Sequence, residues 1–428
     1  MDIYNFVSFA GLFVLLGVGW ALSADRRRMN WRVIAWGVGF QLALGAVVFR
    51  APGSRAVFAW LNDAVLAVLS AAQAGQKFLF GALADGAAMD RAFGAGQGFV
   101  LAIQALPVII FFAALMALLY HWRIMPWVIR GFAWLFTRLM RISGAESLCA
   151  ASNIFVGIES TTTVRPFLAR MTRSEFCTIL TAGMATVASS TLAVYVGFLG
   201  DTFPGIAGHL ISASILSAPA AIVFSKVLLP EDGEPVTLGR SVRPQVEPAA
   251  GAIDAIVGGA MAGVRLVVGI CALLIAFLGM IALVDLGLGQ VGRWVGMDGG
   301  QSGTLSLSWL LGYAFRPVAA AIGVPWSDAR LAGEMLGKRL IATEVPAYFD
   351  LAAALKAHAF QHARSPVVIA YALCGFAHVA SLAIFVGGTA ALVPERRGDL
   401  AAVGPRALLA ATLACLMTGA VAGAFFAG

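Results

Sequence analysis

Long apolar segments alternate with short polar connections along this chain. Crossing a bilayer takes about 20 consecutive apolar residues, and eight segments are long enough to span. Because a lipid-exposed backbone must satisfy its own hydrogen bonds, the predicted fold class is an all-α membrane protein with eight transmembrane helices. The predicted spans are residues 4–22, 32–50, 98–120, 175–199, 206–228, 264–288, 365–388 and 405–427.

Three further segments mix apolar and charged residues. Residues 51–96 carry both acidic and basic side chains, and residues 124–142 interleave arginines with Trp and Phe. A third segment, near 304–318, follows a Gly-rich connection. Basic and aromatic residues interleaved in this way are typical of helices in the membrane interface. We therefore predict peripheral or interfacial helices in these three segments.

Two segments are apolar at their ends and polar at their centres. The first, residues 144–171, is polar around residues 157–161, and the second, residues 328–357, opens at Asp328, a predicted N-cap. Neither segment is apolar enough at its centre to be a continuous span. Such backbone is tolerated at membrane depth only where protein or a water-filled cavity covers it, so we predict two re-entrant hairpins.

The polar stretch of residues 229–250, rich in Pro and charge, divides the chain into two halves and is predicted to be a cytoplasmic loop. Residues 1–97 are expected to form N-terminal peripheral helices. Residues 98–228 are expected to hold a scaffold helix, an interfacial helix, the first hairpin and the first broken span. Residues 251–428 are expected to form the second half, inverted relative to the first. Inverted repeats with a site at the midplane are a transporter architecture.

Composition supports this class. The 428 residues are 60% hydrophobic and 12% charged, with a mean hydropathy of +0.87, whereas soluble domains carry about 25% charged residues. The five cysteines show no metal-like spacing, and no metalloprotease, nucleotide-loop or nucleophile-elbow motif occurs. The sequence therefore predicts neither an enzyme nor an organic cofactor. The net charge of +7 is explained by cationic cytoplasmic loops and gives no reason to expect nucleic acid.

The basic residues also predict an orientation. No positive charge precedes the first span, and Arg26, Arg27 and Arg28 follow it, the reverse of a secretory signal. Arg396 and Arg397 fall on the same side. The positive-inside rule then predicts that both termini lie outside.

The ionisable residues inside these segments are the candidate functional residues. Glu159 and Glu344 lie in the two hairpins, and His378 interrupts the span at 365–388. Charged groups at bilayer depth are costly and by default suggest function. Carboxylates there can accept strong hydrogen bonds from hydroxyl or N–H groups of a solute. Asp285, inside another span, has no role that the sequence predicts.

Short motifs recur over most of the chain beyond about residue 98. They are NIFVG (153–157), VRP (164–166), TRSE (172–175), TAGMAT (181–186), HLISASILSAPA (209–220), EVPAY (344–348), YALCGFA (371–377) and ALVPERRGDL (391–400). These motifs resemble those of the concentrative nucleoside transporter family. The resemblance implies a homotrimer in a bacterial cytoplasmic membrane, with a transport domain that moves past a fixed scaffold. It also implies uptake driven by sodium or, in some members, protons.

In the first hairpin, the family has Gly-Gln-Thr-Glu, whose polar side chains meet the nucleobase. This chain has Gly157-Ile158-Glu159, one residue shorter, so the glutamate matches and the Gln-Thr pair is lost. Ser160 and Thr161 are expected to take over some of the hydrogen bonding.

In the second hairpin, the family's Asn-Glu becomes Thr343-Glu344, and the resemblance implies that Glu344 binds ribose. In the following broken span, Phe376 is expected to pack on a ring and Ser381 matches a ribose-binding serine. The family's ribose-binding asparagine is here His378.

The family's sodium site uses an asparagine, a serine and backbone carbonyls. These positions fall on Asn153, Val156, Ser190 and Thr191, with both side-chain ligands intact. Unwound backbone can supply such carbonyls without leaving them unsatisfied.

Plainer roles remain open for these residues. Glu159 is alternatively paired with Arg165 or Arg170, and Glu344 with Lys338 or Arg339. His378 is alternatively a satisfied core histidine. Ser190 and Thr191 alternatively bond back to the carbonyl four residues earlier.

The expected function is ion-coupled nucleoside uptake, with sodium favoured over protons by Asn153 and Ser190. Proton coupling through Glu159, Glu344 or His378 stays open. The alternative is a carrier of the same fold for a non-nucleoside or modified solute, because the Gln-Thr pair and the asparagine are replaced.

Overall fold

The fold is wholly helical in the part of the chain that the structure, a computed structural model, describes. That part is residues 2–94, 98–200, 202–245, 249–294 and 305–427. Apart from one isolated bridge between Ser143 and Leu238, the regular structure there consists of α- and 3₁₀-helices. This confirms the predicted all-α class. Parts of the predicted loop at 229–250 and of the Gly-rich connection before residue 305 lie outside the described residues.

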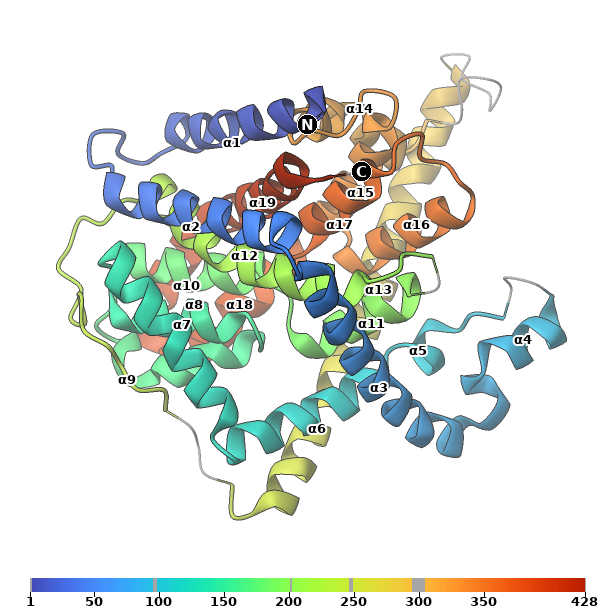
Figure 1. Cartoon of the computed structure of the whole chain (residues 1–428), viewed down its shortest axis with the longest axis horizontal. Coiled ribbons are helices and arrows are strands. Elements are labelled where there is room, and N and C mark those ends of the chain that lie inside the picture. The colour runs from blue at the N-terminus through green and yellow to red at the C-terminus, as the bar shows by residue number, and fades with distance from the viewer. Residues whose placement is uncertain (1, 95–97, 201, 246–248, 295–304, 428) are drawn as a thin grey trace.

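The helices follow one another as shown in Figure 1. Their bounds are α1 Ile3–Ala21, α2 Trp31–Arg50, α3 Ser54–Phe80, η1 Gly81–Ala84, α4 Gly86–Phe93, α5 Leu101–Gln104, α6 Val108–His121, α7 Ile124–Met140, α8 Gly144–Asn153, η2 Ile158–Val164, α9 Arg165–Leu168, α10 Arg173–Ala185, α11 Ser189–Leu199, α12 Ile206–Leu228, α13 Ala252–Trp294, α14 Leu307–Ala321, α15 Ala329–Ile341, α16 Glu344–Lys356, α17 Arg364–Leu373, α18 Val379–Leu392, η3 Pro394–Arg396 and α19 Arg397–Phe425.

Eight helical stretches of the described residues are long and apolar enough to cross a membrane. The number equals that expected, but the set differs. The stretch Ala59–Phe93 qualifies, although its sequence predicts an interfacial segment, because Asp63 and Lys77 interrupt the apolar pattern. The predicted span at 365–388 is instead split into α17 and α18, each too short to cross alone.

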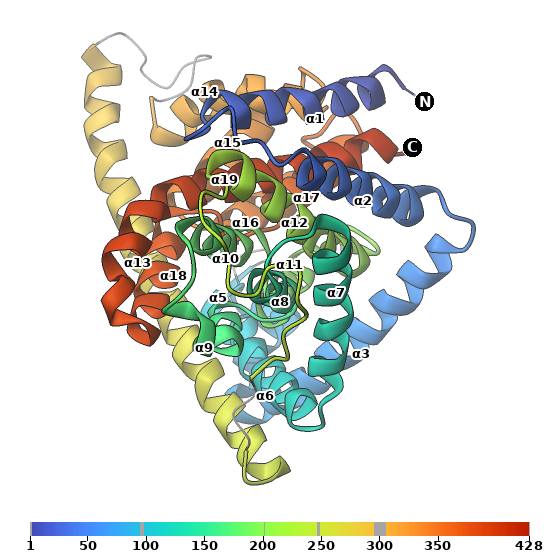
Figure 2. The ribbon, with the colours of Figure 1, turned by 90° about the vertical axis from the view of Figure 1, so that its left-hand side faces the viewer.

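The C-terminal helix α19 forms the centre of the molecule. It packs against α1, α10, α12, α17 and α18. The two ends of the chain lie side by side (Figures 1 and 2), because Asn5 Nδ2 donates to the carbonyls of Gly423, Ala424 and Phe426 at 2.8–3.2 Å. The first predicted span is thus anchored against the last one.

Helix α13 has 43 residues and is about 65 Å long at 1.5 Å per residue, so it extends well beyond the predicted span at 264–288. In Figure 2 it runs along one side of the molecule. Gly259 and Gly263, four residues apart, let it approach α6 closely, since a Cβ at either glycine would lie 2.7 Å from α6 backbone atoms.

Near the other end of α13, Asp285 Oδ1 accepts from the Leu307 N–H at 2.6 Å and holds the start of α14. This contact gives Asp285 a structural role.

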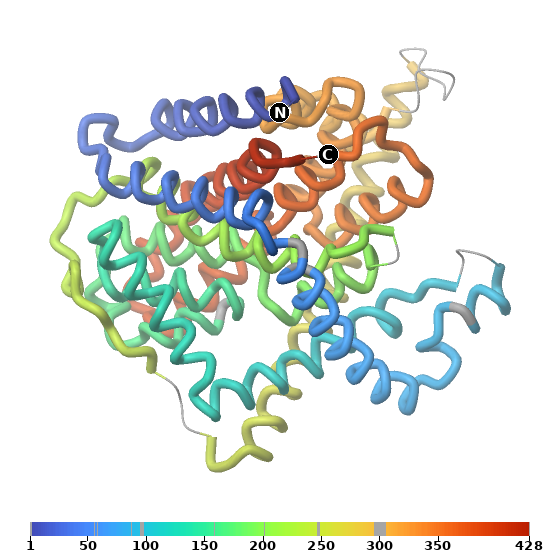
Figure 3. Tube along the Cα trace, in the orientation of Figure 1, coloured from blue at the N-terminus to red at the C-terminus, as the bar shows by residue number. Residues whose placement is uncertain are grey.

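The segment from α3 to α5 extends to one side of the remaining helices (Figure 3). It contacts the body through α3, which packs on α2, α6 and α12, and through Phe99, whose ring lies against Phe198 and Phe349. Helix α7, predicted as interfacial, buries Met125, Ile129 and Phe136 and exposes Trp127 and Trp134. One face of α7 therefore packs on protein, as expected of an amphipathic helix.

Both predicted hairpins are helix–turn–helix units. The first runs from α8 through η2 to α9, and the second runs from α15 to α16 across residues 342–343. Asp328 precedes α15, but its side chain does not cap that helix. Its carboxylate instead accepts from the N–H groups of Gln361 and His362, both at 3.1 Å, and from Ser365 Oγ at 2.6 Å. Asp328 therefore occupies the predicted N-cap position, but its side chain does not cap the helix, because the fold brings the beginning of α17 to this carboxylate.

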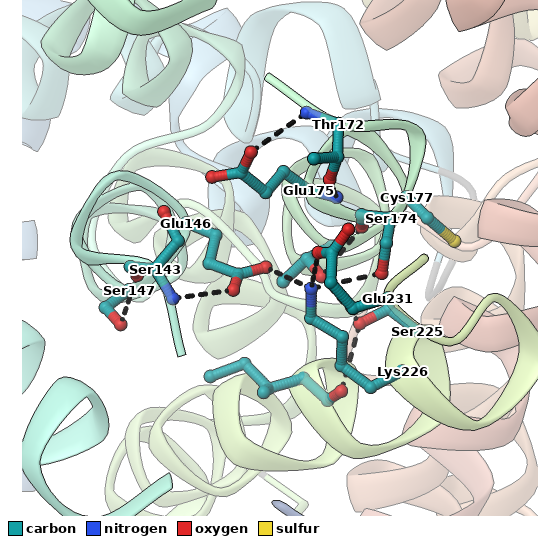
Figure 4. A network of polar contacts seen from close by, with 12 residues as sticks. Ser143, Glu146, Ser147, Thr172, Ser174, Glu175, Cys177, Ser225, Lys226 and Glu231 are labelled. Atoms are coloured by element: carbon teal, nitrogen blue, oxygen red, sulfur yellow. Dashed lines mark hydrogen bonds and ion pairs between the residues drawn. The ribbon is translucent and has the colours of Figure 1, made fainter. Parts of the chain in front are cut away.

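A buried ion network holds the base of the first hairpin (Figure 4). Lys226, 5% exposed, places Nζ 2.8 Å from Glu146 Oε2 and 3.1 Å from Glu231 Oε2, and donates to Ser174 Oγ at 3.1 Å. The other oxygen of Glu146 accepts from the Ser143 N–H and caps α8. The network therefore joins α8, α10, α12 and the beginning of the central loop.

The two broken spans meet at their breaks. A side chain at Gly375, between α17 and α18, would lie 2.8 Å from the carbonyl oxygen of Ala185, the last residue of α10. The Cys415 thiol of α19 donates to the carbonyls of both Ala185 and Cys374, at 3.7 and 3.5 Å. Only glycine permits this approach, so the two interruptions form one polar region inside the protein.

Candidate functional site

Glu344 lies at the start of α16, buried with 3% of its surface exposed. The Tyr195 hydroxyl, from α11, donates to its Oε1 at 2.6 Å. His378 Nε2, from the break before α18, lies 3.0 Å from its Oε2. The carboxylate thus joins the second hairpin to both broken spans.

His378 is the N-cap of α18, where Nδ1 accepts from the Ser381 N–H at 3.2 Å. Because Nδ1 accepts, a neutral ring carries its proton on Nε2. That atom lies 2.8 Å from Ser381 Oγ as well as near Glu344. The structure therefore brings together three of the predicted substrate residues, Glu344, His378 and Ser381.

Phe376 belongs to the same break. Its ring is half-buried, and its carbonyl accepts from the His378 N–H at 2.9 Å. The backbone bond places the aromatic ring and the imidazole two residues apart in a tight turn. An apolar ring beside a polar cluster is the arrangement typical of small-molecule sites.

The first hairpin presents a different surface. Glu159 is exposed, whereas Ser160 and Thr161 are buried. The Ser160 hydroxyl faces inward and lies 3.6 Å from the Cys149 thiol. Their 3₁₀-helix, η2, packs against α18, which begins directly after His378. Glu159 is therefore the predicted residue of this hairpin that the structure leaves accessible to a solute.

The charged neighbours proposed as alternative partners of Glu344 make other contacts. Lys338 pairs with Asp350 at 2.5 Å, and Arg339 Nη1 donates to the carbonyl of Ala372 at 2.7 Å. The interpretation of Glu344 as an ion-pair partner of either residue is therefore wrong. The hairpin turn directs the glutamate away from both basic side chains and toward Tyr195.

Asn153, at the end of α8, has the properties expected of an ion ligand. Its side chain is fully buried, and Nδ2 donates to the Cys149 carbonyl at 3.0 Å. Its Oδ1 is buried without a hydrogen-bond partner. A buried acceptor without a partner is costly, and a cation would satisfy it. In the described part of the chain, no three His, Cys, Asp or Glu side chains gather as they do around a transition metal.

The other predicted sodium ligands lie in the turn after α8 and in the first turn of α11, directly after the first break. Val156 is half-buried in the turn after α8, and Ser190 and Thr191 are buried at the start of α11. Neither of these hydroxyls makes the backward bond to the carbonyl four residues earlier, within the hydrogen bonds found for the described residues. Thr186 makes that bond, to Ala182 at 2.9 Å. An oxygen-rich region of this kind fits a hard cation such as sodium.

Ser214 of α12 holds the two unwound segments in place. Its hydroxyl lies 3.0 Å from the Ile154 carbonyl and 3.3 Å from that of Val187, and donates to them. The Ser189 N–H donates to the Phe155 carbonyl at 3.0 Å. The first hairpin and the first break are therefore joined by backbone and side-chain bonds at the predicted ion site.

Sequence reasoning missed Tyr195 and Ser214. In the sequence, Tyr195 is a single aromatic residue in an apolar span. No feature of the neighbouring sequence therefore indicates its contact with Glu344. Ser214 lies within the HLISASILSAPA motif, whose serines at a helical spacing are a signal for a polar face. The sequence does not show which backbone segments that face would meet.

Two interrupted hairpins and two broken helices around buried polar residues define a secondary transporter. Three family descriptions match this chain: "Na+ dependent nucleoside transporter N-terminus" at residues 10–83, "Nucleoside recognition" at 102–202 and "Na+ dependent nucleoside transporter C-terminus" at 209–423. The chain belongs to the concentrative, Na⁺-dependent nucleoside transporter family. It is therefore a multi-pass membrane transporter and not an enzyme.

Similar proteins cover nearly the whole chain. The nucleoside permease NupC of Helicobacter pylori is 36% identical over 421 residues, covering 98% of this chain and 97% of the permease. The uncharacterized transporter YutK of Bacillus subtilis is 36% identical and covers 97% and 98% of the two chains. The sodium/nucleoside cotransporter 1 of Rattus norvegicus is also 36% identical, but the match spans 64% of its longer chain.

Solved structures agree with this assignment. CNTnw in an inward-facing, substrate-bound state superposes with a TM-score of 0.90 and 36% identity, covering 99% of this chain and all of that one. A doubly substituted CNTnw in an outward-facing state gives a TM-score of 0.89, with 36% identity over 99% of this chain and 98% of that one. The fold predicted from the sequence is confirmed.

Proposed function

We propose that this protein carries nucleosides, or closely related solutes, into the cell together with sodium. The observation that supports this most directly is the buried cluster of Glu344, His378 and Ser381, which joins the second hairpin to a helix break. A nucleoside offers ribose hydroxyls that donate to a carboxylate and accept from an imidazole. Charge-assisted hydrogen bonds of this kind are strong in a desolvated site.

Sodium is the coupling ion that the residues support. Asn153 offers a buried oxygen without a partner, and Ser190, Thr191 and the Val156 carbonyl complete the proposed ligand set. Ser214 holds the adjoining carbonyls in place. Glu159, Glu344 and His378 remain the groups through which protons would act instead.

A second candidate is a symporter of the same fold for a modified nucleoside or a non-nucleoside solute. Three observations favour it. Both oxygens of Glu344 already have neighbours, at 2.6 and 3.0 Å, and an imidazole stands where the family has an amide. Ser160 and Thr161, expected to replace the missing Gln-Thr pair, are buried. The base-recognition surface is therefore reduced to Glu159 and Phe376.

We further propose an elevator mechanism, in which hairpins and broken spans move past a scaffold that includes α6 and α13. CNTnw, of the same fold, has structures named as inward-facing, intermediate and outward-facing. In a single chain, apolar residues of α13 such as Ile275 and Leu286 are more than 70% exposed. The proposed homotrimer would cover part of this helix. The proposed location is a bacterial cytoplasmic membrane, with both termini outside.

The test is uptake by the purified protein in sealed liposomes. A panel of labelled ribonucleosides, deoxyribonucleosides, free bases and free ribose is presented with an inward sodium gradient, an inward proton gradient or no gradient. We expect nucleosides alone to accumulate, and only with sodium. Accumulation of a base or sugar in preference to every nucleoside would favour the second candidate. Uptake driven by protons without sodium would contradict the proposed ion site.

A further inference from the structure

Arg339, near the end of α15, is a fully buried cation without an acidic partner in the described part of the chain. Its side chain is 1% exposed. Nη1 donates to the Ala372 carbonyl at 2.7 Å, and Nε has no acceptor. The adjacent Lys338 pairs with Asp350 instead. A buried charge is destabilising unless the groups around it offset the free-energy cost of its desolvation. The groups around the guanidinium must therefore provide this compensation.

Those surroundings are the C-terminus of α17, a helix of ten residues. The last carbonyls of a helix lack helical partners and give that end a partial negative charge. Here the second hairpin supplies the missing donors: Arg339 to the Ala372 carbonyl, and the Tyr348 hydroxyl to that of Ala370 at 2.8 Å. The positive charge therefore lies at the negative end of the broken helix.

The other half of the same break has the opposite polarity. Helix α18 begins after His378, and its N-terminus carries a partial positive charge. Glu344, from the second arm of the hairpin, lies against His378 at this end. One hairpin thus supplies a cation to the end of α17 and an anion to the beginning of α18. The two residues are five positions apart, across the hairpin turn.

The first hairpin differs at the comparable position. Asn153 precedes Glu159 by six residues, much as Arg339 precedes Glu344. The asparagine is neutral and offers a buried oxygen without a partner, which accepts a cation. The arginine is itself the cation and offers N–H groups. The two hairpins therefore meet their helix breaks with opposite chemistry: one can bind an ion from solution, and the other carries a charge covalently attached to the chain.

We propose that the Arg339 guanidinium is the resident cation of the α17–α18 break and a positioning residue for the substrate site. It fixes the end of α17 and, through residues 374–377, the placement of His378 against Glu344, without an ion from solution. This inference rests on the proposed function, in that Glu344 and His378 bind the solute. In the second half of the protein, the fixed positive charge of Arg339 thus takes the role that sodium is proposed to have in the first half.

The test uses the full-length purified protein and the variants Arg339→Gln, Arg339→Lys and Arg339→Ala. Binding of labelled uridine and of ²²Na⁺, the latter without nucleoside, is measured separately. We expect Arg339→Gln to weaken uridine binding at least tenfold while sodium affinity changes less than twofold. Arg339→Lys, which keeps the charge, should stay within about threefold of the unsubstituted protein. Unchanged uridine binding in Arg339→Gln would overturn the proposal, as would a parallel loss of both affinities.

A second measurement does not depend on the nucleoside. Millimolar guanidinium should raise the thermal transition of Arg339→Ala saturably, whereas equal potassium should not, and neither salt should stabilise the unsubstituted protein. Absence of this rescue would overturn the resident-cation role. If rescue occurs but the unsubstituted protein binds no uridine and no other nucleoside, the proposed substrate fails and the role of Arg339 stands. Where Arg339→Gln does not fold, a tenfold loss of uridine binding in Arg339→Lys overturns the proposal.

Discussion

Nε2 of His378 lies 3.0 Å from Oε2 of Glu344, and both side chains are buried. The two residues come from different elements, the break before α18 and the second hairpin, and are 34 positions apart in the chain. Because Tyr195 engages the other carboxylate oxygen, Glu344 is held from two sides before any solute binds. This pre-organisation limits the orientational freedom that binding must remove.

Glu344→Gln is expected to abolish sodium-driven uptake while leaving expression near normal. The amide keeps the shape of the side chain but loses the charge that strengthens its hydrogen bonds. Such bonds contribute about 1.5–3 kcal/mol each, so solute binding should weaken about 10- to 100-fold. Uptake in liposomes and equilibrium binding measure the effect. Glu334→Gln, on the other arm of the same hairpin and partly exposed beside Arg330, is the matched control. Normal uptake by Glu344→Gln would remove this residue from the site.

Tyr195→Phe is expected to weaken solute binding about tenfold, because Oε1 of Glu344 loses its hydroxyl donor. The ring itself should stay in place, since it stacks on Tyr348 with centroids 4.3 Å apart. Sodium affinity, measured without solute, should not change. Tyr313→Phe, a half-exposed tyrosine of α14, serves as the control. A variant that binds solute like the unsubstituted protein would show that Tyr195 does not orient the carboxylate.

Asn153→Ala is expected to raise the sodium concentration needed for half-maximal uptake about tenfold, because the buried Oδ1 is lost as a ligand. A titration of uptake against external sodium at constant ionic strength measures it. Ser147→Ala provides the comparison on the same helix, since the Ser147 hydroxyl donates to the carbonyl of Ser143, the N-cap of α8, at 2.8 Å. An unchanged sodium titration in Asn153→Ala would argue for coupling by protons.

His378→Asn is expected to shift the order of preferred solutes toward that of family members with asparagine. The imidazole, with Nδ1 engaged by the Ser381 N–H, offers a single donor at Nε2, whereas an amide offers both a donor and an acceptor. A change of one hydrogen bond should alter the ratio of affinities between two nucleosides by about tenfold. His362→Asn, on a partly exposed histidine, is the control. Identical preference profiles would mean that His378 is a structural residue.

Lys226→Met is expected to destabilise the protein by about 3–5 kcal/mol, because the Glu146 carboxylate stays buried without its partner. Thermal or denaturant unfolding in detergent measures the loss. The double variant Glu146→Gln/Lys226→Met should recover much of it, as expected for coupled neighbours. Lys356→Met, on an exposed lysine, should change stability by less than about 0.5 kcal/mol. Equal stability of Lys226→Met and the unsubstituted protein would show that the network is not a structural anchor.

The sequence alone was sufficient for the fold class, the family, both hairpins and the interruption of two spans. These features depend on local composition: an apolar run long enough to span, or a polar residue placed where lipid would penalise it, is visible in a single segment. At residues 51–96 the local rules predicted helices but not their length: the structure has α3, η1 and α4 there, and the stretch Ala59–Phe93 is long and apolar enough to cross a membrane. Asp328 shows a second limit. Its position at a helix start was predicted, but its hydrogen bonds go to residues more than thirty positions away.

Only the tertiary structure decided which groups share a site. Glu344 meets Tyr195 and His378, Ser214 joins two unwound segments, and Arg339 faces the end of α17, all across distances in sequence that no motif encodes. The physical reason is that helix packing, set by the sum of many weak apolar contacts, brings distant polar atoms together. Most buried polar atoms then take the partner that packing places beside them, whatever charge their sequence neighbours carry, whereas a few, such as Oδ1 of Asn153, are left without one.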